Sequence, residues 1–241
     1  MKVLIDGDIL VYRTGFSCKP DDPWYVAKSR LRKTINDILE QTGCRNAEIY
    51  LSDSLENNYR SRLHPLYKAN RKLAPRPAYY VELANELVDG YEGRPSAAQE
   101  ADDDIGIRAN QLGDECIIAT IDKDLLQIPG KHFNWVSGTW RDISIGEGRF
   151  RFYSQILTGD ATDNITSKVG LSCPGVGASK ARRFLEGCGT DSDYEFRIWE
   201  VCGRYIKDHD DVELHKRIEV TGQLVKIRQQ PNEMWTYGYK K

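Results

Sequence analysis

The sequence lacks the features of a transmembrane helix and of a structural zinc site. No stretch approaches the roughly 20 consecutive apolar residues of a transmembrane helix. Its six cysteines are scattered and form no Cys-x-x-Cys pair, which argues against a zinc site and favours reduced thiols in a cytoplasm. The opening "MKVLIDGDIL" is too acidic for a signal peptide and predicts a strand. The 241 residues, 40% of them hydrophobic, suggest a globular cytoplasmic protein.

A surplus of positive charge is also missing, because the formal net charge is −2. Proteins that bind nucleic acid are usually more basic. The total hides two blocks without any acid, residues 57–81 and 164–185. Their basic residues are Arg60, Arg62, Lys68, Arg71, Lys72, Arg76, Lys168, Lys180, Arg182 and Arg183. Separate basic and acidic blocks are typical of a metal-dependent nuclease, although ordinary proteins also show them by chance.

Short apolar segments alternate with segments of helical periodicity. Strands are predicted in "KVLIDGD" (2–8), "AEIYLSD" (47–53) and "ECIIATIDKD" (115–124), with further strand pieces over 131–153 around a turn at "VSGTW". Helices are predicted over 25–42, 80–90 and 97–113, after Gly177, and twice within 190–241. The alternation predicts an α/β fold with a mostly parallel sheet flanked by helices.

Acids follow three of the predicted strands at the point where each strand ends. They are Asp6 and Asp8, Asp53, and Asp122 and Asp124. A single aspartate at such a position is commonly a helix N-cap or a turn residue. Because the carboxyl ends of parallel strands meet at one edge of the sheet, three such positions together predict a shared acidic site there.

Residues 100–106, "EADDDIG", place four acids within five positions, and such crowding costs stability. An acidic run is often a solvated helix face or a first helical turn, where the helix dipole favours negative charge. A divalent metal ion is the alternative, because ligation by hard oxygen atoms replaces the repulsion. Glu100 and Asp103 share a helix face, and Asp102 can join them only near the helix start. Asp104 is expected to stay solvated.

A further pair of acids occurs in "LTGDATDN", residues 157–164. If this segment forms a helical turn, Asp160 and Asp163 share one face. If it forms a loop, the same spacing suits a pair of Asx turns. The sequence leaves both possibilities open.

The segment "CPGVGASKARRFLEG", residues 173–187, combines a glycine turn with a following basic helix. Backbone N–H groups at such a turn and helix start form an anion site. Lys180, Arg182 and Arg183 project from the first helical turns. The pattern is typical of a helix-hairpin-helix, which grips a phosphate backbone without reading bases.

Six motifs occur in the order found in one known family: "LIDGD", "YKANR", "EADDDIG", "TIDKDLLQ", "GDATDN" and "CPGVGASKA". In these motifs, between about residues 3 and 185, the chain resembles the 5′-nuclease (flap endonuclease) family. The resemblance is strongest to bacteriophage 5′-3′ exonucleases and to the 5′-nuclease domain of bacterial DNA polymerase I. It implies a PIN-like (resolvase-like) metal-binding core over 1–155, with a basic arch at about 55–98. Residues 156–241 are then expected to form the helix-hairpin-helix (helix-three-turn-helix) module and C-terminal helices packed on the core.

The resemblance also implies a role for each acid. The carboxylates expected nearest a first metal ion are Asp6, Asp53, Glu100 and Asp102, with Asp103 as a further member of that cluster. The group expected toward a second ion, partly through water, is Asp122, Asp124, Asp160 and Asp163. The expected cofactors are two Mg²⁺ ions, for which Mn²⁺ can substitute. Asp8 and Asp104 stand beside motif positions and leave open which neighbour ligates.

The basic segment and the glycine turn are expected to contact DNA. Lys68 and Arg71 match a basic pair that contacts the scissile phosphate, and Tyr67 matches an aromatic position where a base stacks. The contacts expected at the hairpin, with a K⁺ ion at the turn, are Gly175, Gly177, Ser179 and Lys180. The residues expected to carry catalysis are Asp6, Asp122, Lys68 and Arg71.

The implied function is metal-dependent hydrolysis of DNA phosphodiester bonds, with 5′-3′ exonuclease and structure-specific flap endonuclease activities. The expected partner is a 5′ flap, a 5′ end or a branched duplex, bound by a monomer during DNA replication. The location would be a host cytoplasm if the chain is encoded by a bacteriophage. Two alternatives remain open. One is a PIN-like endoribonuclease, and the other is a non-catalytic structure-specific DNA-binding protein, although no acid of the family pattern is missing.

Overall fold

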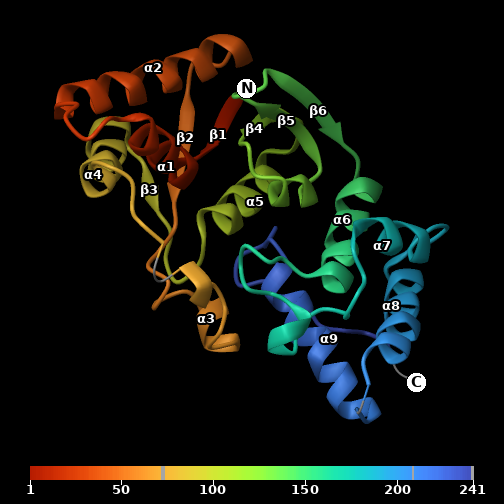
Figure 1. Ribbon diagram of the computed structural model, residues 1–241. Helices are drawn as coiled ribbons and strands as arrows, with labels where there is room; N and C mark the ends of the chain where they lie inside the picture. Colours follow the sequence, from red (N-terminus) through yellow and green to blue (C-terminus); the bar gives the residue numbers. More distant parts are fainter. Residues whose placement is uncertain (72–73, 208, 240–241) are drawn as a thin grey trace. The chain divides into compact units, whose positions relative to one another are not determined.

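The computed structural model describes residues 1–71, 74–207 and 209–239 (Figure 1). By its internal contacts the chain divides into two compact units. The first unit contains Met1–Asn58, Ala74–Ile143 and Ile227–Pro231, and the second contains Tyr59–Leu73, Ser144–Lys226 and Asn232–Lys241. Lys72 of the basic block lies outside the described residues. The functional division near residue 155 stays a prediction.

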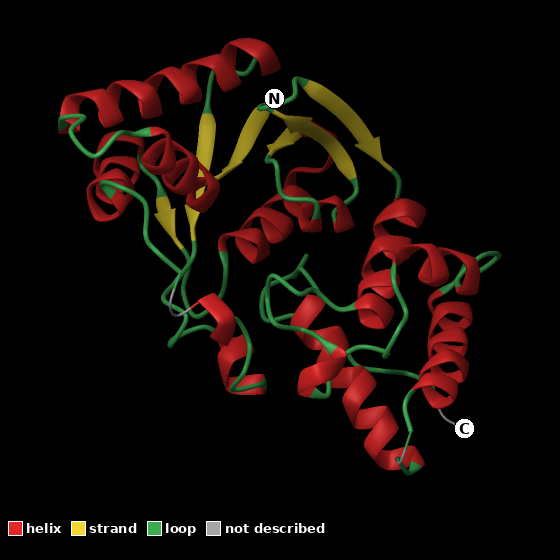
Figure 2. Cartoon of the chain, viewed as in Figure 1, coloured by secondary structure: helices red, strands yellow, loops and turns green. Residues whose placement is uncertain are grey.

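The first unit is built on a sheet that has six strands among the described residues. They are β1 (Lys2–Asp6), β2 (Ala47–Leu51), β3 (Arg94–Pro95), β4 (Cys116–Ala119), β5 (Gly130–Asn134) and β6 (Thr139–Ile143), in the order β3-β2-β1-β4-β5-β6. Neighbouring strands are parallel except β5 and β6, which form the hairpin predicted at "VSGTW". Figure 2 shows helices around these strands, and the predicted α/β class is confirmed.

Helices cover both faces of this sheet. They are α1 (Gly7–Ser17), α2 (Trp24–Thr42), α4 (Tyr80–Tyr91) and α5 (Ala101–Leu112). Val3 and Ile5 pack in one core with α1, α2 and α4, whereas Leu4 packs in a second core with α5 (Figure 1). Successive side chains of a strand point to opposite faces, so β1 is buried on both sides. The interior of β1 is therefore apolar, and its carboxylate, Asp6, lies at the carboxyl end of the strand.

The second unit is helical. Its helices are α3 (Tyr59–Leu63), α6 (Ile145–Thr158), α7 (Ala178–Phe184), α8 (Asp191–Tyr205) and α9 (Asp211–Val225). The predicted strand pieces up to residue 153 are wrong beyond β6, because α6 occupies that segment. Ser144 Oγ accepts the Glu147 N–H at 3.2 Å, and the Glu147 carboxylate accepts the Ser144 N–H at 2.9 Å. This capping box starts a helix where the aromatic run alone favours a strand.

None of the helices in the described ranges combines the length and the apolarity that a membrane span needs.

Glu48 on β2 is a buried carboxylate surrounded by cations. It is 5% exposed and pairs with Lys2 at 2.5 Å, Arg94 at 2.6 Å and Arg108 at 2.8 Å. Burial alone would raise the pKa of Glu48. Hydrogen bonds from Arg108, Lys2 and Tyr50 outweigh burial and hold that pKa well below its ordinary value of 4.5.

Replacing Glu48 with glutamine is expected to lower the free energy of unfolding by about 2 kcal/mol at pH 7, because three cations lose their shared partner while staying partly solvated. Since the pKa of Glu48 is lowered in the folded state, its stabilisation is present above pH 4.5 and is lost as the pH falls through the folded value. Urea unfolding at pH 7 and pH 3 measures both effects. Asp37→Asn, which breaks only the surface pair with Lys33, is the control and should change little. An equal loss at the two pH values contradicts the assignment.

Candidate functional site

The strand-end acids of the first unit gather at the carboxyl edge of the sheet. Asp6 is the last residue of β1 and is 4% exposed. Burial, together with the negative charges of Asp8 and Asp122, raises the pKa of Asp6 to about 8. These charges show that acids from the ends of β1 and β4 lie within electrostatic range of each other. A bound cation would relieve both the burial of the charge and the repulsion.

Ser52, in the loop after β2, links the starts of α1 and α5. Its backbone N–H donates to Asp8 Oδ2 at 3.2 Å, and its hydroxyl accepts the Ala101 N–H at 3.0 Å. The next residue, Asp53, accepts the Ala98 N–H through Oδ2 at 2.8 Å. This hydrogen bond is the main cause that lowers the pKa of Asp53, which therefore stays ionised. The start of α1 and the loop after β2 are thus hydrogen-bonded to each other, and that loop is bonded to the start of α5.

Within "EADDDIG", Asp103 is wholly buried, with 0% of its surface exposed. Both of its oxygens accept backbone N–H groups: Oδ2 from Glu100 at 3.2 Å and Oδ1 from Arg228 at 3.0 Å. Asp103 therefore holds the start of α5 against a segment near the C-terminus. Its predicted place among the metal ligands stays a prediction.

The other acids of the run have different surroundings. Asp104 is partly exposed, and its Oδ1 accepts the Gln99 side-chain amide at 2.7 Å. The expectation that Asp104 stays solvated and does not ligate stays a prediction. Glu100 is the N-cap residue of α5 and is 8% exposed. Asp102 lies in the first helical turn and is partly exposed. The run is thus a first helical turn, as one of the two readings of the sequence expects, and it also lies at the edge that carries Asp53.

The acids after β4 shape a tight turn. The Asp122 N–H donates to Thr120 Oγ1 at 3.0 Å, and Asp122 Oδ1 accepts the Asp124 N–H at 2.8 Å. Asp124 begins the 3₁₀ helix η3 (Asp124–Gln127). Both carboxylates are partly exposed. The turn therefore presents two acids beside the end of β4.

Whether this edge can bind a metal ion depends on the carboxylate oxygens that it offers as ligands. Among the described residues, no group of three or more Asp, Glu, His or Cys side chains is already arranged to bind a metal ion. The carboxylates of Asp6, Asp53 and Asp122 instead accept N–H groups of nearby backbone. Carboxylate oxygens are the ligands that Mg²⁺ and Mn²⁺ prefer, and a buried acid beside two others lacks charge compensation. Each carboxylate keeps further lone pairs beside the accepted N–H, so the residues fit a divalent ion if their side chains turn toward it.

In the second unit, the predicted basic pair is bound to the loop that carries Asp163. The Asp163 carboxylate forms ion pairs with Arg71 and, at 3.7 Å, with Lys68. Arg71 Nε also donates to the Thr162 carbonyl at 3.1 Å. The Tyr67 hydroxyl donates to Asp163 Oδ2 at 3.0 Å. The Asp163 carboxylate, itself a predicted metal ligand, thus binds all three of the predicted DNA-contacting residues Tyr67, Lys68 and Arg71.

Tyr67 is buried in this arrangement. Its side chain is 2% exposed, and Lys68 Nζ lies 5.2 Å from the ring centre. Lys68 has a positive φ of 53°, which is uncommon for a residue with a side chain. Stacking of a base on Tyr67 would require the ring to leave this position, and it stays a prediction.

The segment around Asp160 is a loop rather than a helical turn. Asp160 pairs with Ile165 in an isolated antiparallel bridge, and its Oδ1 accepts the Thr162 N–H at 2.7 Å. The helical-turn prediction is therefore wrong, and the alternative of an Asx turn is confirmed for Asp160. The predicted grouping of Asp160 and Asp163 with the acids after β4 stays a prediction.

Arg60 is buried and has a structural role, which the sequence did not distinguish from the roles of its basic neighbours. It is 2% exposed, and its guanidinium donates to the carbonyls of Leu224 at 3.0 Å and Lys226 at 2.6 Å. A cation at the end of a helix satisfies carbonyls that lack partners within it. Arg60 therefore fastens the basic segment to the end of α9.

The glycine turn at the predicted hairpin is open to solvent. Gly175 has a φ of +66°, and Gly177 is the N-cap of α7. A Cβ added at either glycine would meet nothing within 4 Å. Lys180 Nζ donates to the Gly175 carbonyl at 2.9 Å, and Ser179 is exposed. The backbone of this turn is accessible to a ligand.

An exposed aromatic pair on α1 was not singled out from the sequence. Tyr12 is 41% exposed and Phe16 60%, and their ring centres lie 6.1 Å apart. The Tyr80 ring meets Tyr12 edge-on at 5.5 Å, and Arg76 lies 4.8 Å from the centre of Tyr80. Burial and the charge of Asp8 raise the pKa of Tyr80, which places this aromatic surface beside the acidic edge. In the sequence, the spacing of four residues between Tyr12 and Phe16 could have indicated that both rings lie on one face of a helix.

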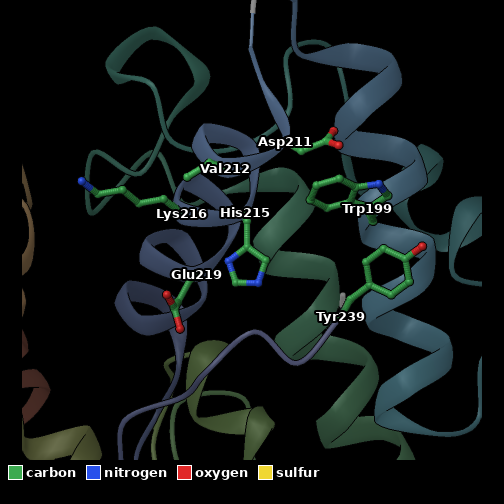
Figure 3. Close-up of a pocket in the computed structure, with 7 residues that line it drawn as sticks. All are labelled: Trp199, Asp211, Val212, His215, Lys216, Glu219 and Tyr239. Atoms are coloured by element: carbon green, nitrogen blue, oxygen red, sulfur yellow. The ribbon is translucent and has the colours of Figure 1, made fainter. Parts of the chain in front are cut away.

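A pocket of about 330 Å³ lies between α8, α9 and the C-terminal segment (Figure 3). Figure 3 shows Trp199 and Tyr239 on one side and His215 on the other. It is lined by Trp199, Asp211, Val212, His215, Lys216, Glu219 and Tyr239, none of which is a predicted site residue. All the residues that line the pocket belong to the second unit, whereas the acidic edge belongs to the first.

A family model described as the 5′-3′ exonuclease N-terminal resolvase-like domain matches residues 1–151. The chain is 26% identical to a 5′-3′ exonuclease of Buchnera aphidicola subsp. Schizaphis graminum (strain Sg) over 191 residues, which cover 70% of this chain and 66% of that protein. It is 26% identical to the exonuclease of Escherichia phage T7 over 188 residues, which cover 70% of this chain and 63% of that protein. The chain thus spans slightly less than two thirds of the length of both curated relatives.

Solved structures share the fold at low identity. A flap endonuclease variant of bacteriophage T5, in a complex with DNA and metal ions, has a TM-score of 0.63 and 17% identity, covering 93% of this chain and 85% of that one. The T5 5′-exonuclease with bound zinc has a TM-score of 0.64 and 16% identity, covering 93% and 89%. The catalytic core of Rad2 with DNA substrate has a TM-score of 0.52 and 13% identity, covering 98% and 83%. The predicted PIN-like fold is therefore confirmed, together with its C-terminal helical region.

Proposed function

Because the chain belongs to the 5′-3′ exonuclease family through its N-terminal resolvase-like domain, we propose that it is a metal-dependent DNA 5′-nuclease. It hydrolyses phosphodiester bonds as a 5′-3′ exonuclease and flap endonuclease. The observation that carries the proposal is the acidic edge, where the buried Asp6 lies within range of the charges of Asp8 and Asp122. Such a grouping destabilises a protein unless the charges serve to bind a cation.

The acids of the edge would hold two divalent ions. Bound ions of this kind activate water and stabilise the leaving oxygen of a phosphodiester. The residues that would hold them in the first unit are Asp6, Asp53, Glu100, Asp102, Asp122 and Asp124. The family relation also predicts Asp160 and Asp163 as ligands, and this stays a prediction. The family relation favours Mg²⁺, and Mn²⁺ has the same preference for oxygen ligands.

Lys68 and Arg71 act on the scissile phosphate. Both cations reach the single carboxylate of Asp163, so the segment can direct two positive charges at one oxyanion. Positive groups aimed at a phosphate stabilise the charge that develops during hydrolysis. A phosphate or a metal ion must displace the present ion pairs, so Asp163 serves as their counterion in the absence of DNA.

The exposed glycine turn binds the duplex through its phosphates. Gly175 and Gly177 present accessible backbone, and Ser179 and Lys180 are exposed beside them. Backbone contacts of this kind fix the position of DNA without reading its sequence. The exposed turn would hold a K⁺ ion, which would supply positive charge toward the phosphates. The family relation further favours a monomer that acts in DNA replication in a cytoplasm, which is that of the host if the source is a bacteriophage.

A substrate comparison tests this function. A 5′-labelled flap duplex, a blunt duplex, a single strand and an RNA flap of equal sequence are each incubated with the chain and Mg²⁺. Cleavage near the flap junction and stepwise loss of nucleotides from 5′ ends are expected, with DNA preferred. Preference for RNA favours the PIN-like endoribonuclease, and tight binding without cleavage favours a DNA-binding protein.

Tyr12→Ala is expected to weaken binding of a single-stranded 5′ flap by about 1–3 kcal/mol, the contribution of one base stacked on an aromatic ring. The ring is exposed beside the acidic edge and is supported by Tyr80. Fluorescence anisotropy with a flap duplex in Ca²⁺ measures the affinity. Tyr25→Ala is the control, because Tyr25 is 71% exposed on α2. Equal effects of the two substitutions contradict a role for this surface.

A further inference from the structure

The segment Ile227–Pro231 lies within the first compact unit, although it follows the last helix of the second and lies outside the 1–151 family match. Ile227 is 4% exposed and packs in the core with Leu125, Ile105 and Ala109. The core that supports the acidic edge is therefore completed by residues from near the C-terminus.

This segment is hydrogen-bonded to both parts of the chain that carry acids. The Arg228 N–H donates to Asp103 Oδ1 at 3.0 Å, at the start of α5. The Ile227 N–H donates to Gln127 Oε1 at 3.3 Å, in the turn that begins with Asp124. The two successive N–H groups thus connect the start of α5 with the turn after β4.

The Arg228 side chain adds a third connection. It is 8% exposed, and Nη1 donates to Gln99 Oε1 at 2.9 Å. The amide group of Gln99 in turn donates to Asp104 Oδ1 at 2.7 Å. A guanidinium thereby fixes the orientation of a side chain that holds one of the acids, next to the N-cap residue Glu100.

Close packing keeps the segment in place. A Cβ added at Gly106 would lie 2.2 Å from the Arg228 carbonyl oxygen and 3.0 Å from Ile227 Cγ2. Backbone at 2.2 Å cannot yield by a side-chain rotation, so the glycine is required for the segment to reach α5.

We propose that Arg228 is a positioning residue of the metal-binding edge. It holds the start of α5, and the preceding Ile227 N–H joins this segment to the 3₁₀ helix after β4. The inference rests on the proposed function of that edge. Partners that orient metal ligands typically change metal affinity by about 10- to 100-fold when they are replaced. Arg228 acts through Asp103 and Gln99, and the neighbouring Ile227 acts through Gln127.

Two variants of the full chain test the proposal, with Mn²⁺ binding measured by calorimetry and folding by urea unfolding. Arg228→Met removes the guanidinium but keeps the N–H and the apolar stem, and Gly106→Ala displaces the segment without changing any acid. Each is expected to weaken Mn²⁺ binding at least about tenfold. Arg228→Lys is expected to recover part of the affinity.

Matched controls separate positioning from stability. Gly146→Ala makes the same change in α6, where an added Cβ meets nothing within 4 Å, and should leave Mn²⁺ affinity unchanged. Ile38→Val destabilises the other core of the first unit and should also leave it unchanged. If Gly106→Ala does not fold, Gln99→Met replaces it, because it removes the acceptor of the guanidinium.

The outcomes distinguish this inference from the proposed function. If Arg228→Met and Gly106→Ala both bind Mn²⁺ as tightly as the native chain, and the native chain cuts DNA, the positioning role is wrong and the proposed function stands. Mn²⁺ binding that is lost in both variants, in a chain that cuts no nucleic acid, supports the positioning role and overturns the nuclease. A native chain that binds no Mn²⁺ overturns both.

Discussion

Asp6→Asn is expected to reduce metal-dependent cleavage of a 5′ DNA flap by about a thousandfold or more. Ligation by a charged oxygen at the end of β1 is lost, and metal ions contribute several kcal/mol to such reactions, where about 1.4 kcal/mol changes a rate tenfold. The same substitution is expected to stabilise the metal-free protein at neutral pH. Asparagine removes a carboxyl group that burial and two neighbouring acids disfavour, yet it still accepts the Ile9 N–H as an N-cap.

The test combines single-turnover cleavage in Mg²⁺ with urea unfolding in EDTA. Asp210→Asn is the matched control, because Asp210 is the N-cap of α9 and its Oδ1 accepts the Glu213 N–H at 2.8 Å. The control should change neither cleavage nor stability. Loss of stability together with loss of cleavage in Asp6→Asn would mean that Asp6 serves the fold and not a metal ion.

Lys68→Ala and Arg71→Ala are each expected to slow cleavage about 100-fold once the DNA is fully bound. Removal of one preorganised donor from a developing negative charge typically has an effect of this size. The structure brings both side chains to the carboxylate of Asp163, which has the negative charge and the paired oxygens that Arg recognises in phosphate as well. Arg71→Lys should be intermediate, because lysine keeps the charge and loses the bidentate geometry.

Single-turnover rates at saturating enzyme separate this effect from weaker binding. Arg62→Ala is the control, since it removes one positive charge from the same acid-free segment. It should weaken binding in a salt-dependent way and leave the saturated rate nearly unchanged. If Lys68→Ala and Arg71→Ala behave in the same way as Arg62→Ala, the pair only attracts DNA.

Local patterns were sufficient for β1, β2 and β4 and for the acids of the first unit, but not for β3, whose two residues form no apolar run. The apolar runs of β1, β2 and β4 predict buried parallel strands, and their ends place acids at one edge. They were insufficient for α1, because "DILVY" directly continues an apolar strand and its apolar residues suit either structure. The Asp6 N-cap, which accepts the Ile9 N–H, separates strand from helix there.

The hydrogen-bond and ion-pair partners of several acids come from residues that are distant in the sequence. Asp103 looked like a ligand because it shares a helix face with Glu100, yet its oxygens accept N–H groups, one of them from Arg228 far along the chain. Asp163 likewise meets Arg71 from a distant segment. Tertiary pairs of this kind leave no periodic signal, so a single sequence shows which acids gather but not how each is used.

The central claim is that the crowded acids serve a metal ion that cuts DNA. The most direct measurement incubates one 5′-labelled flap duplex with the native chain and with Asp6→Asn, in Mg²⁺, in Ca²⁺ and in EDTA. The account predicts products from the native chain in Mg²⁺, none in EDTA and almost none from Asp6→Asn. Equal cleavage with and without Mg²⁺, or none by the native chain in Mg²⁺ or Mn²⁺ despite tight DNA binding, would contradict it.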